Sequence, residues 1–179
     1  MELQGSKTEQ NLLKAFKGES EARNKYTFYA SEAKKAGYIH LSEIYLKTAN
    51  NEEEHAKIWF KHLNNENIAD TISNLNNCIQ NELFEHATMY PQYAKEAEEE
   101  GFTEIAQHFY GVAKIEGMHK TRFEILQKEI LNNTTFRKEV EILWECQNCG
   151  YITRSKNAPT KCPVCSHPQG FFYKHNENY

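Results

Sequence analysis

Two short runs of this chain combine side chains that bind metal ions, Glu52-Glu-Glu-His55 and Glu116-Gly-Met-His119. In each run a glutamate precedes a histidine by three positions. On a helix both side chains would project from one face and could bind the same ion. One such pair in a glutamate-rich chain is commonly solvated surface charge. Two pairs in the same register, each on the apolar stripe of an expected helix, indicate a metal site instead.

Further glutamates lie on or beside the apolar stripes. Several buried carboxylates without countercharge would cost several kcal/mol each, so a set of them requires cations. Two divalent or two trivalent ions bracket the charge of five carboxylates. Oxygen-rich ligation with two imidazoles favours iron or manganese over copper, and zinc stays open. Glu85 taken alone fits a surface position equally well. The five glutamates are Glu19, Glu52, Glu82, Glu85 and Glu116.

Four amphipathic helices are expected to carry these residues. Apolar residues recur at helical spacing over residues 8–36, 39–63, 75–100 and 103–131, and Gly37 and Gly101 are stop signals after the first and third helix. The polar residues 64–74 are expected to form a crossover connection. This pattern predicts a mainly α fold, a ferritin-like four-helix bundle, in which two helices carry Glu-x-x-His and the other two each carry a glutamate.

The two helical hairpins resemble copies of each other. At a constant offset of 64, Tyr26 corresponds to Tyr90, and the glycine stops and both Glu-x-x-His runs also correspond. Glu19 would map onto residue 83, whereas the nearest inward carboxylate is Glu82. One extra residue therefore lies between Glu82 and Tyr90, which predicts a π-bulge between Glu82 and Pro91.

The C-terminal part is expected to be a separate small β-type metal module. Two Cys-x-x-Cys knuckles, Cys146/Cys149 and Cys162/Cys165, can direct four thiolates at one tetrahedral ion, either zinc or iron. We place the bundle in residues 1–135 and the module in 136–179, with a linker at 132–140. The expected aromatic core of the module is Trp144, Tyr151, Phe171, Phe172 and Tyr173.

Composition limits the classes of partner. The formal net charge is −4 and the sequence pI is about 6.1, which argues against a nucleic-acid partner. No apolar run reaches membrane-spanning length and no signal peptide is recognisable, so we expect a soluble cytoplasmic protein without a membrane partner. No Gly-x-Gly-x-x-Gly occurs, so direct binding of NADH is not expected. We take the remaining histidines as surface or packing residues and Cys78 as a small buried hydrophobe.

Over its whole length the chain resembles the rubrerythrins. The resemblance rests on Glu19 within Ala-Phe-Lys-Gly-Glu-Ser-Glu-Ala-Arg-Asn-Lys-Tyr, on both Glu-x-x-His runs, and on Glu82-x-x-Glu85 followed by Met-Tyr-Pro. It continues through Trp-x-Cys-x-Asn-Cys-Gly-Tyr to Cys-Pro-x-Cys. One departure is Ser166, which follows the last cysteine where free-standing rubredoxins usually have glycine. This serine would alter the hydrogen bonding to the cysteine sulfurs and, through it, the reduction potential of the bound iron.

The resemblance implies a non-haem di-iron peroxidase that reduces hydrogen peroxide to water in oxidative-stress defence. Glu52 and Glu116 would bridge two iron ions, and Glu19 and Glu82 would be terminal ligands. His119 would bind one iron throughout, while the other moves between Glu85 when oxidised and His55 when reduced. Tyr26 and Tyr90 would hydrogen-bond to ligand carboxylates. The metal ligands implied are Glu19, Glu52, His55, Glu82, Glu85, Glu116, His119, Cys146, Cys149, Cys162 and Cys165.

The resemblance also implies the route of the electrons. One iron ion held by the four cysteines would relay them to the di-iron site across the interface of a head-to-tail homodimer, after a separate reductase or small electron carrier had supplied them. Two rival functions stay open. One is iron oxidation and storage, as in a ferritin relative, and the other is a zinc-bound structural or interaction protein.

Overall fold

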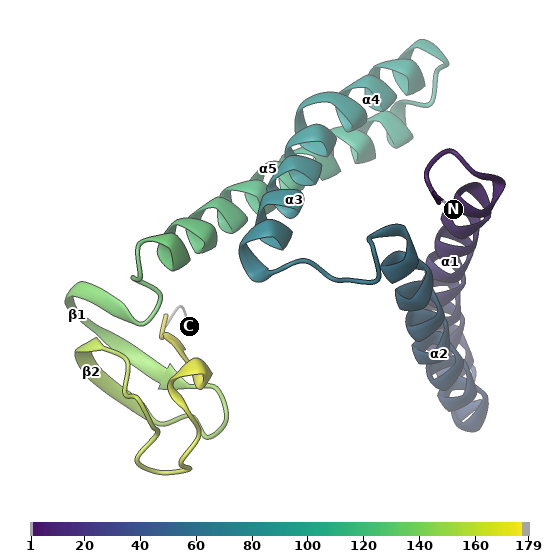
Figure 1. Ribbon diagram of the computed structural model, residues 1–179. Helices are drawn as coiled ribbons and strands as arrows, with labels where there is room; N and C mark the ends of the chain where they lie inside the picture. Colours follow the sequence, from purple (N-terminus) through teal and green to yellow (C-terminus); the bar gives the residue numbers. More distant parts are fainter. Residues whose placement is uncertain (1, 177–179) are drawn as a thin grey trace. The chain divides into compact units, whose positions relative to one another are not determined.

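The computed structural model describes residues 2–176 of the chain. They divide into two compact units, of which the first ends at Ala69 and the second begins at Asp70. Figure 1 shows helices in both units and a small sheet in the second. The expected class, mainly α with a small β-type module, is confirmed.

The first unit is one antiparallel helical hairpin. Helix α1 spans Lys7–Lys35 and α2 spans Ile39–Leu63, and the turn between them contains Gly37 at φ 84°. Both helices end within a residue of their predicted bounds. Ser6 begins α1 by accepting a hydrogen bond from the Glu9 backbone N–H at 3.0 Å. The two helices pack through a seam of small buried side chains: Ala30, Ala33, Ser42, Ala49 and Ala56.

The second unit contains the other hairpin, and its first helix starts earlier than predicted. Helix α3 spans Thr71–Phe84, so the connection to α2 is residues 64–70 and not 64–74. Asp70 is the cause, because its carboxylate accepts hydrogen bonds from the backbone N–H groups of Ile72 and Ser73. These bonds satisfy two donors that a helix start otherwise leaves free.

A π-helical turn interrupts the third predicted helix. The turn η1 spans Glu85–Met89 and joins α3 to α4, Tyr90–Glu99. The Tyr90 backbone N–H donates to the Glu85 carbonyl five positions back, which widens the helix by one residue. This confirms the bulge predicted between Glu82 and Pro91.

Helix α5 spans Thr103–Leu131, as predicted, and packs against α4 after a turn at Gly101, φ 87°. The seam of this hairpin repeats that of the first. Four buried residues lie 64 positions after Ala30, Ala33, Ser42 and Ala49, which supports a duplication. They are Ala94, Ala97, Ala106 and Ala113.

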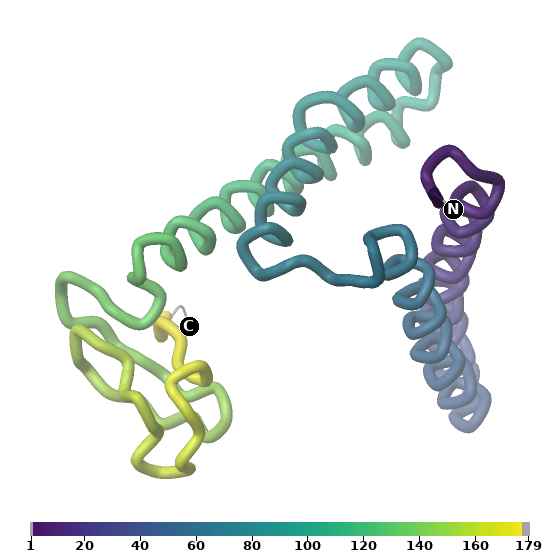
Figure 2. The backbone as a smooth tube through the Cα atoms, in the orientation of Figure 1, coloured from purple at the N-terminus to yellow at the C-terminus, as the bar shows by residue number. Residues whose placement is uncertain are grey.

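The module is a three-stranded antiparallel sheet in the order β2-β1-β3, formed by β1 Arg137–Cys146, β2 Ile152–Asn157 and β3 Phe172–Lys174. Figure 2 traces the backbone of the module, in light green to yellow, through its successive reversals of direction. Strand β1 starts inside the predicted linker 132–140, which was therefore too long.

Trp144 and Phe172 form the core of the module, with Tyr151 packed against it. Phe171 and Tyr173 are 38% and 45% exposed, so their assignment to the core was wrong.

Candidate metal centres

The first hairpin brings three predicted ligands together. Ligand atoms of Glu19 from α1 and of Glu52 and His55 from α2 lie within 4.8 Å of one another. His55 Nδ1 is 2.8 Å from Glu52 Oε2 and 3.8 Å from Glu19 Oε2. The spacing of three residues in α2 therefore places an imidazole and a carboxylate side by side, and α1 adds the second carboxylate.

The second hairpin repeats this arrangement. Glu82 from α3 and Glu116 and His119 from α5 form the second cluster. His119 Nδ1 is 2.7 Å from Glu116 Oε2 and 3.4 Å from Glu82 Oε2. The two clusters thus have the same composition and nearly the same spacing, as the duplication predicts.

The second cluster fits a bound cation. Burial raises the pKa of the Glu82 carboxyl, and the adjoining Glu116 carboxyl raises it further. Glu82 Oε2 is buried and has no hydrogen-bond partner among the described residues. These two neighbouring carboxylates share a single histidine, so a multivalent ion would add the positive charge that such a pair needs.

Glu85 lies outside both clusters that the described residues form. It begins the π-helical turn, one turn after Glu82, and its charge helps to raise the pKa of Glu82. Burial, followed by the charges of Glu85 and Glu116, raises the pKa of Tyr90. Tyr90 is thus close enough to the second cluster for the charge of Glu116 to act on its hydroxyl group. Tyr26, its counterpart in the first hairpin, stacks on Tyr45 with ring centroids 6.3 Å apart.

His86 connects the π-helical turn to α5 through a side-chain contact. The sequence predicted only a surface or packing position for this histidine. Its Nδ1 is 2.6 Å from the Ala113 carbonyl oxygen, and its ring lies over Gly117. A Cβ atom at position 117 would lie 2.9 Å from the ring. The only sequence signal was the glycine between Glu116 and His119, which is unusual inside a helix.

A double-mutant cycle tests this contact. Gly117→Ala gains about 1 kcal/mol of helix propensity but displaces the His86 ring, so we expect little net change in the free energy of unfolding. In the His86→Ala background the same substitution should stabilise the protein by about 1 kcal/mol. Urea unfolding followed by circular dichroism measures the difference. Equal effects in both backgrounds would contradict the contact.

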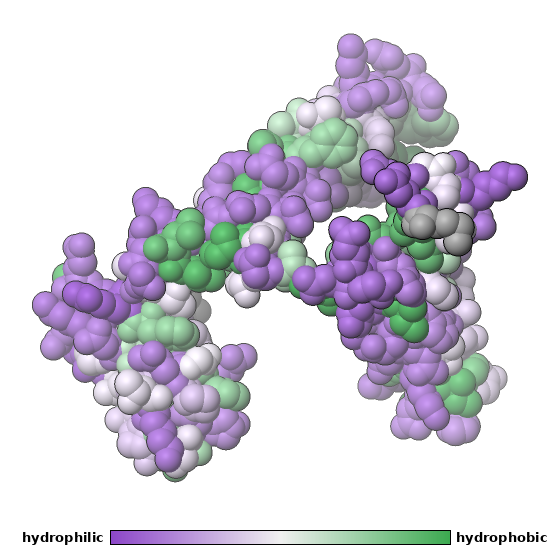
Figure 3. All heavy atoms as spheres, viewed as in Figure 1, coloured by the Kyte–Doolittle hydropathy of each residue, from purple (hydrophilic) through white to green (hydrophobic). Residues whose placement is uncertain are grey.

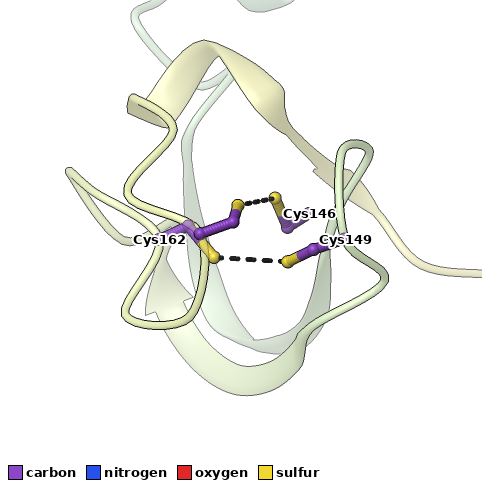
Figure 4. A group of neighbouring side chains, drawn as sticks. Cys146, Cys149 and Cys162 are labelled. Carbon is purple, nitrogen blue, oxygen red and sulfur yellow. Dashed lines mark hydrogen bonds between the residues drawn. The ribbon is translucent and has the colours of Figure 1, made fainter.

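The four cysteines of the module converge. The Sγ atoms of Cys146 and Cys165 are 3.7 Å apart, and those of Cys149 and Cys162 are 3.6 Å apart. Figure 4 shows Cys146, Cys149 and Cys162 pointing toward one another. Tetrahedral thiolates at about 2.3 Å from a metal would lie about 3.8 Å apart, so the spacing fits one ion.

The backbone of each knuckle supports the thiolate form. The His167 backbone N–H, the largest influence, lowers the pKa of Cys165 to about 5. The Tyr151 N–H acts in the same way on Cys149, but burial and the neighbouring sulfurs outweigh it and raise the pKa of that thiol to about 12. At neutral pH the thiol of Cys165 is therefore ionised and that of Cys149 is not. A cation at the centre of the four cysteines would ionise all of them.

Ser166 occupies a left-handed backbone position, φ 62°, and Gly150 occupies the equivalent position of the first knuckle, φ 73°. We expect Ser166→Gly to stabilise the module by about 0.5–1 kcal/mol and Gly150→Ser to destabilise it by a similar amount. A Cβ at residue 150 would meet nothing within 4 Å, so the cost there is one of the backbone alone. Thermal unfolding followed by Trp144 fluorescence measures both. A destabilised Ser166→Gly variant would show that the serine makes a compensating contact.

Comparisons with known proteins match both parts of the chain. The family profile described as Rubrerythrin matches residues 10–127. The profile described as the rubredoxin-like domain of rubrerythrin matches residues 144–173. Together they include all seven carboxylate and histidine ligands predicted from sequence and all four cysteines.

Similar proteins match over nearly the full length. The chain is 42% identical to a rubrerythrin of Clostridium perfringens, aligned over 99% of this chain and 98% of that protein. It is 41% identical to the rubrerythrin of Nitratidesulfovibrio vulgaris, over 95% of each. Among solved structures, a partially reduced state of nigerythrin is 25% identical and covers 97% of this chain and 91% of that one, with a TM-score of 0.35.

Proposed function

Because the chain belongs to the rubrerythrin family, with a di-iron carboxylate site and a rubredoxin-like four-cysteine site, we propose that it is a non-haem di-iron peroxidase. Its substrate would be hydrogen peroxide, which it reduces to water. The observation that carries this proposal is the pair of matching Glu, Glu, His clusters in a chain that also holds four converging cysteines.

The resemblance to the family suggests the role of each ligand. Glu52 and Glu116, each beside the histidine of its own helix, would be the carboxylates that both irons share. Glu19 and Glu82 would be terminal ligands, and His119 would bind one iron throughout. Glu85 and His55 would alternate on the other iron. The position of Glu85 outside the second cluster, on a widened helical turn, supports a ligand that is not always bound.

The chain provides the surroundings for the reaction. Bound iron supplies the electrons and Lewis acidity that cleave the O–O bond. The carboxylates balance the change in charge, and Tyr90 keeps its proton because burial and the nearby glutamates raise its pKa. A protonated phenol beside the cluster can donate a hydrogen bond to a ligand carboxylate, and Tyr26 would do the same in the first hairpin.

Electrons would enter through the module. Cys146, Cys149, Cys162 and Cys165 would hold one iron that passes electrons to the carboxylate centre of a head-to-tail homodimer. A separate reductase or small redox protein would be the donor. Within residues 2–176 no helix has the length and apolar character needed to cross a membrane. The thiols of all five cysteines are free, which supports our placement of the protein in the reducing cytoplasm.

Replacing Glu85 tests the proposal. We expect Glu85→Ala to slow peroxide turnover at least about 10-fold while the iron content of the carboxylate centre stays within about twofold, because Glu85 is needed only in one state of the cycle. Anaerobic peroxide consumption and metal analysis give the two quantities. Glu99→Ala, an exposed carboxylate of α4 paired with Lys95, is the matched control. Turnover in Glu85→Ala equal to that of the unaltered protein would refute ligand exchange.

Two measurements separate the rival functions. Iron storage predicts very many iron atoms per chain after aerobic loading, whereas the peroxidase predicts a few. A structural zinc protein would be colourless, whereas iron bound to four thiolates absorbs visible light. Metal analysis and a visible spectrum of the purified protein therefore decide between the three.

A further inference from the structure

The connection between α2 and α3 is too short for the crossover of a ferritin-like bundle. In that fold one long crossover joins the two hairpins, so that the helices on either side of it run parallel. The structure begins α3 at Thr71, which leaves residues 64–70 for this connection. The distance that these seven residues must cover can be calculated from the positions of the ligands.

Glu52 and Glu82 must lie at the same level of the bundle to reach one pair of metal ions. Glu52 is eleven residues before the end of α2 at Leu63, and Glu82 is eleven residues after the start of α3 at Thr71. At 1.5 Å per residue each stretch is about 16.5 Å long. In parallel helices the two lengths add, so Leu63 and Thr71 would be about 33 Å apart along the bundle.

The loop cannot reach that far. Eight steps of fully extended chain from Leu63 to Thr71 span about 29 Å at most. The first residues are not extended, because Asn65 and Glu66 have φ 54° and 64°. The Glu66 N–H donates to the Lys61 carbonyl at 2.7 Å and closes this turn. The four steps from Asn67 to Thr71 then span about 14 Å.

In each hairpin, apolar side chains on the face that carries the ligands are exposed to solvent. The buried helical residues are nearly all alanines at the seams. On α5 the stripe that carries Glu116 and His119 continues into Leu126 and Ile130, which are 43% and 37% exposed. In the first hairpin Leu41, three turns before Glu52 on the same stripe of α2, is 41% exposed, and apolar residues are visible on the surface in Figure 3. A hairpin of this kind needs a second hairpin to form a core.

We propose that the second hairpin comes from another copy of the chain. Two copies exchange hairpins, so that each carboxylate centre combines Glu19, Glu52 and His55 of one copy with Glu82, Glu116 and His119 of the other. The short loop then connects two different bundles and need not traverse either one. The inference rests on the carboxylate centre of the proposed function and states which copy supplies each ligand.

Complementation between two defective variants tests the exchange. One variant carries Glu52→Ala and His55→Ala, the other carries Glu116→Ala and His119→Ala, and each bears a different affinity tag. In an exchanged heterodimer one centre has both defective halves and the other has both intact halves. Co-expressed heterodimer purified on both tags should therefore bind about half the carboxylate-centre iron of the unaltered dimer, while each variant alone binds almost none.

The outcome that overturns the exchange is a heterodimer as iron-poor as its parents, because unexchanged chains always combine one intact and one defective half. An unaltered protein that is monomeric at 20.9 kDa, with its carboxylate centre loaded, would also overturn it and would indicate an up-down-up-down bundle within one chain. An unaltered protein that binds iron only at its cysteines would instead refute the proposed function itself.

A longer loop provides a second test of the exchange. Inserting about 15 Gly/Ser residues between Glu66 and Asn67 lets one chain reach across its own bundle, where the effective concentration is in the millimolar range. We expect each bundle to form within one chain and to keep its iron, so that the two defective variants no longer complement each other when both carry the insertion, as metal analysis of their co-expressed dimer measures. The same insertion after Asn133, in the turn that follows α5, is the control and should leave complementation unchanged. Complementation that persists after the first insertion would count against exchange.

Discussion

Glu116→Ala should abolish the carboxylate centre and, with it, peroxide reduction. Glu116 is the carboxylate nearest to His119 and it adjoins Glu82, so its loss would remove the ligand that we propose both irons share. Loss of an outer-shell partner alone costs about 10–100-fold in metal affinity, so loss of a bridging ligand should cost at least about 100-fold. Metal analysis after dialysis and anaerobic peroxide consumption measure the two effects.

Glu124→Ala is the control for this prediction. Glu124 lies on the same helix and pairs with Lys120 at 2.7 Å, but its side chain is far more exposed than that of Glu116. We expect iron content and turnover in Glu124→Ala to match the unaltered protein. Normal iron content in Glu116→Ala would mean that the second cluster is not the site of binding.

Cys162→Ser is expected to unfold the C-terminal module. Cys162 is buried in the module core with Trp144 and Phe172, and metal binding by four thiolates contributes on the order of 10 kcal/mol to the folding of such modules. The visible absorption of the iron thiolate and the near-ultraviolet circular dichroism of Trp144 should be lost. Peroxide reduction driven by a protein electron donor should fall at least about 100-fold, since the relay is missing.

The carboxylate centre should survive in that variant, because the helical hairpins that hold its ligands do not include the module. Metal analysis should therefore show the loss of one iron per chain and the retention of two. Cys78→Ser is the matched control: Cys78 is a half-buried thiol on α3, outside the four-cysteine cluster. Donor-driven turnover that persists in Cys162→Ser would remove the module from the electron path.

The sequence was sufficient to predict the helices that carry the ligands. Three of the four predicted helices end within a residue of the observed bounds, because Gly37 and Gly101 mark the turns within the two hairpins and the apolar stripes are long. The π-helical turn was also predictable. A duplicated chain provides an internal reference, and the one-residue mismatch between Glu82 and Tyr90 had to be absorbed somewhere.

The predictions from sequence were wrong at the start of α3 and in the last strand of the module. The start of α3 was placed four residues late because three of residues 71–74 are polar, while the deciding feature is the side chain of Asp70. This small error in the helix start matters for the topology, because the connection between α2 and α3 is then only seven residues long. Such a loop is too short for the crossover of a ferritin-like bundle. In the module, alternation along a strand of three residues left Phe172 inside and Tyr173 outside, and a run of three aromatic residues does not reveal its register.

The contact of His86 with α5 could not be predicted from the sequence. A histidine that follows a candidate ligand and a glycine that follows another lie 31 positions apart, and nothing local connects them. Only the packing of η1 against α5 brings the ring over Gly117. The duplication gave no help, since Glu53 occupies the position equivalent to Gly117 in the first hairpin.

Anaerobic stopped-flow absorption of the fully reduced protein, mixed with hydrogen peroxide, tests the central claim most directly. The account predicts that the carboxylate centre oxidises first and the iron of the four cysteines afterwards, and that Glu116→Ala abolishes both phases. Rapid oxidation of the four-cysteine iron by peroxide in Glu116→Ala, at the rate of the unaltered protein, would contradict it.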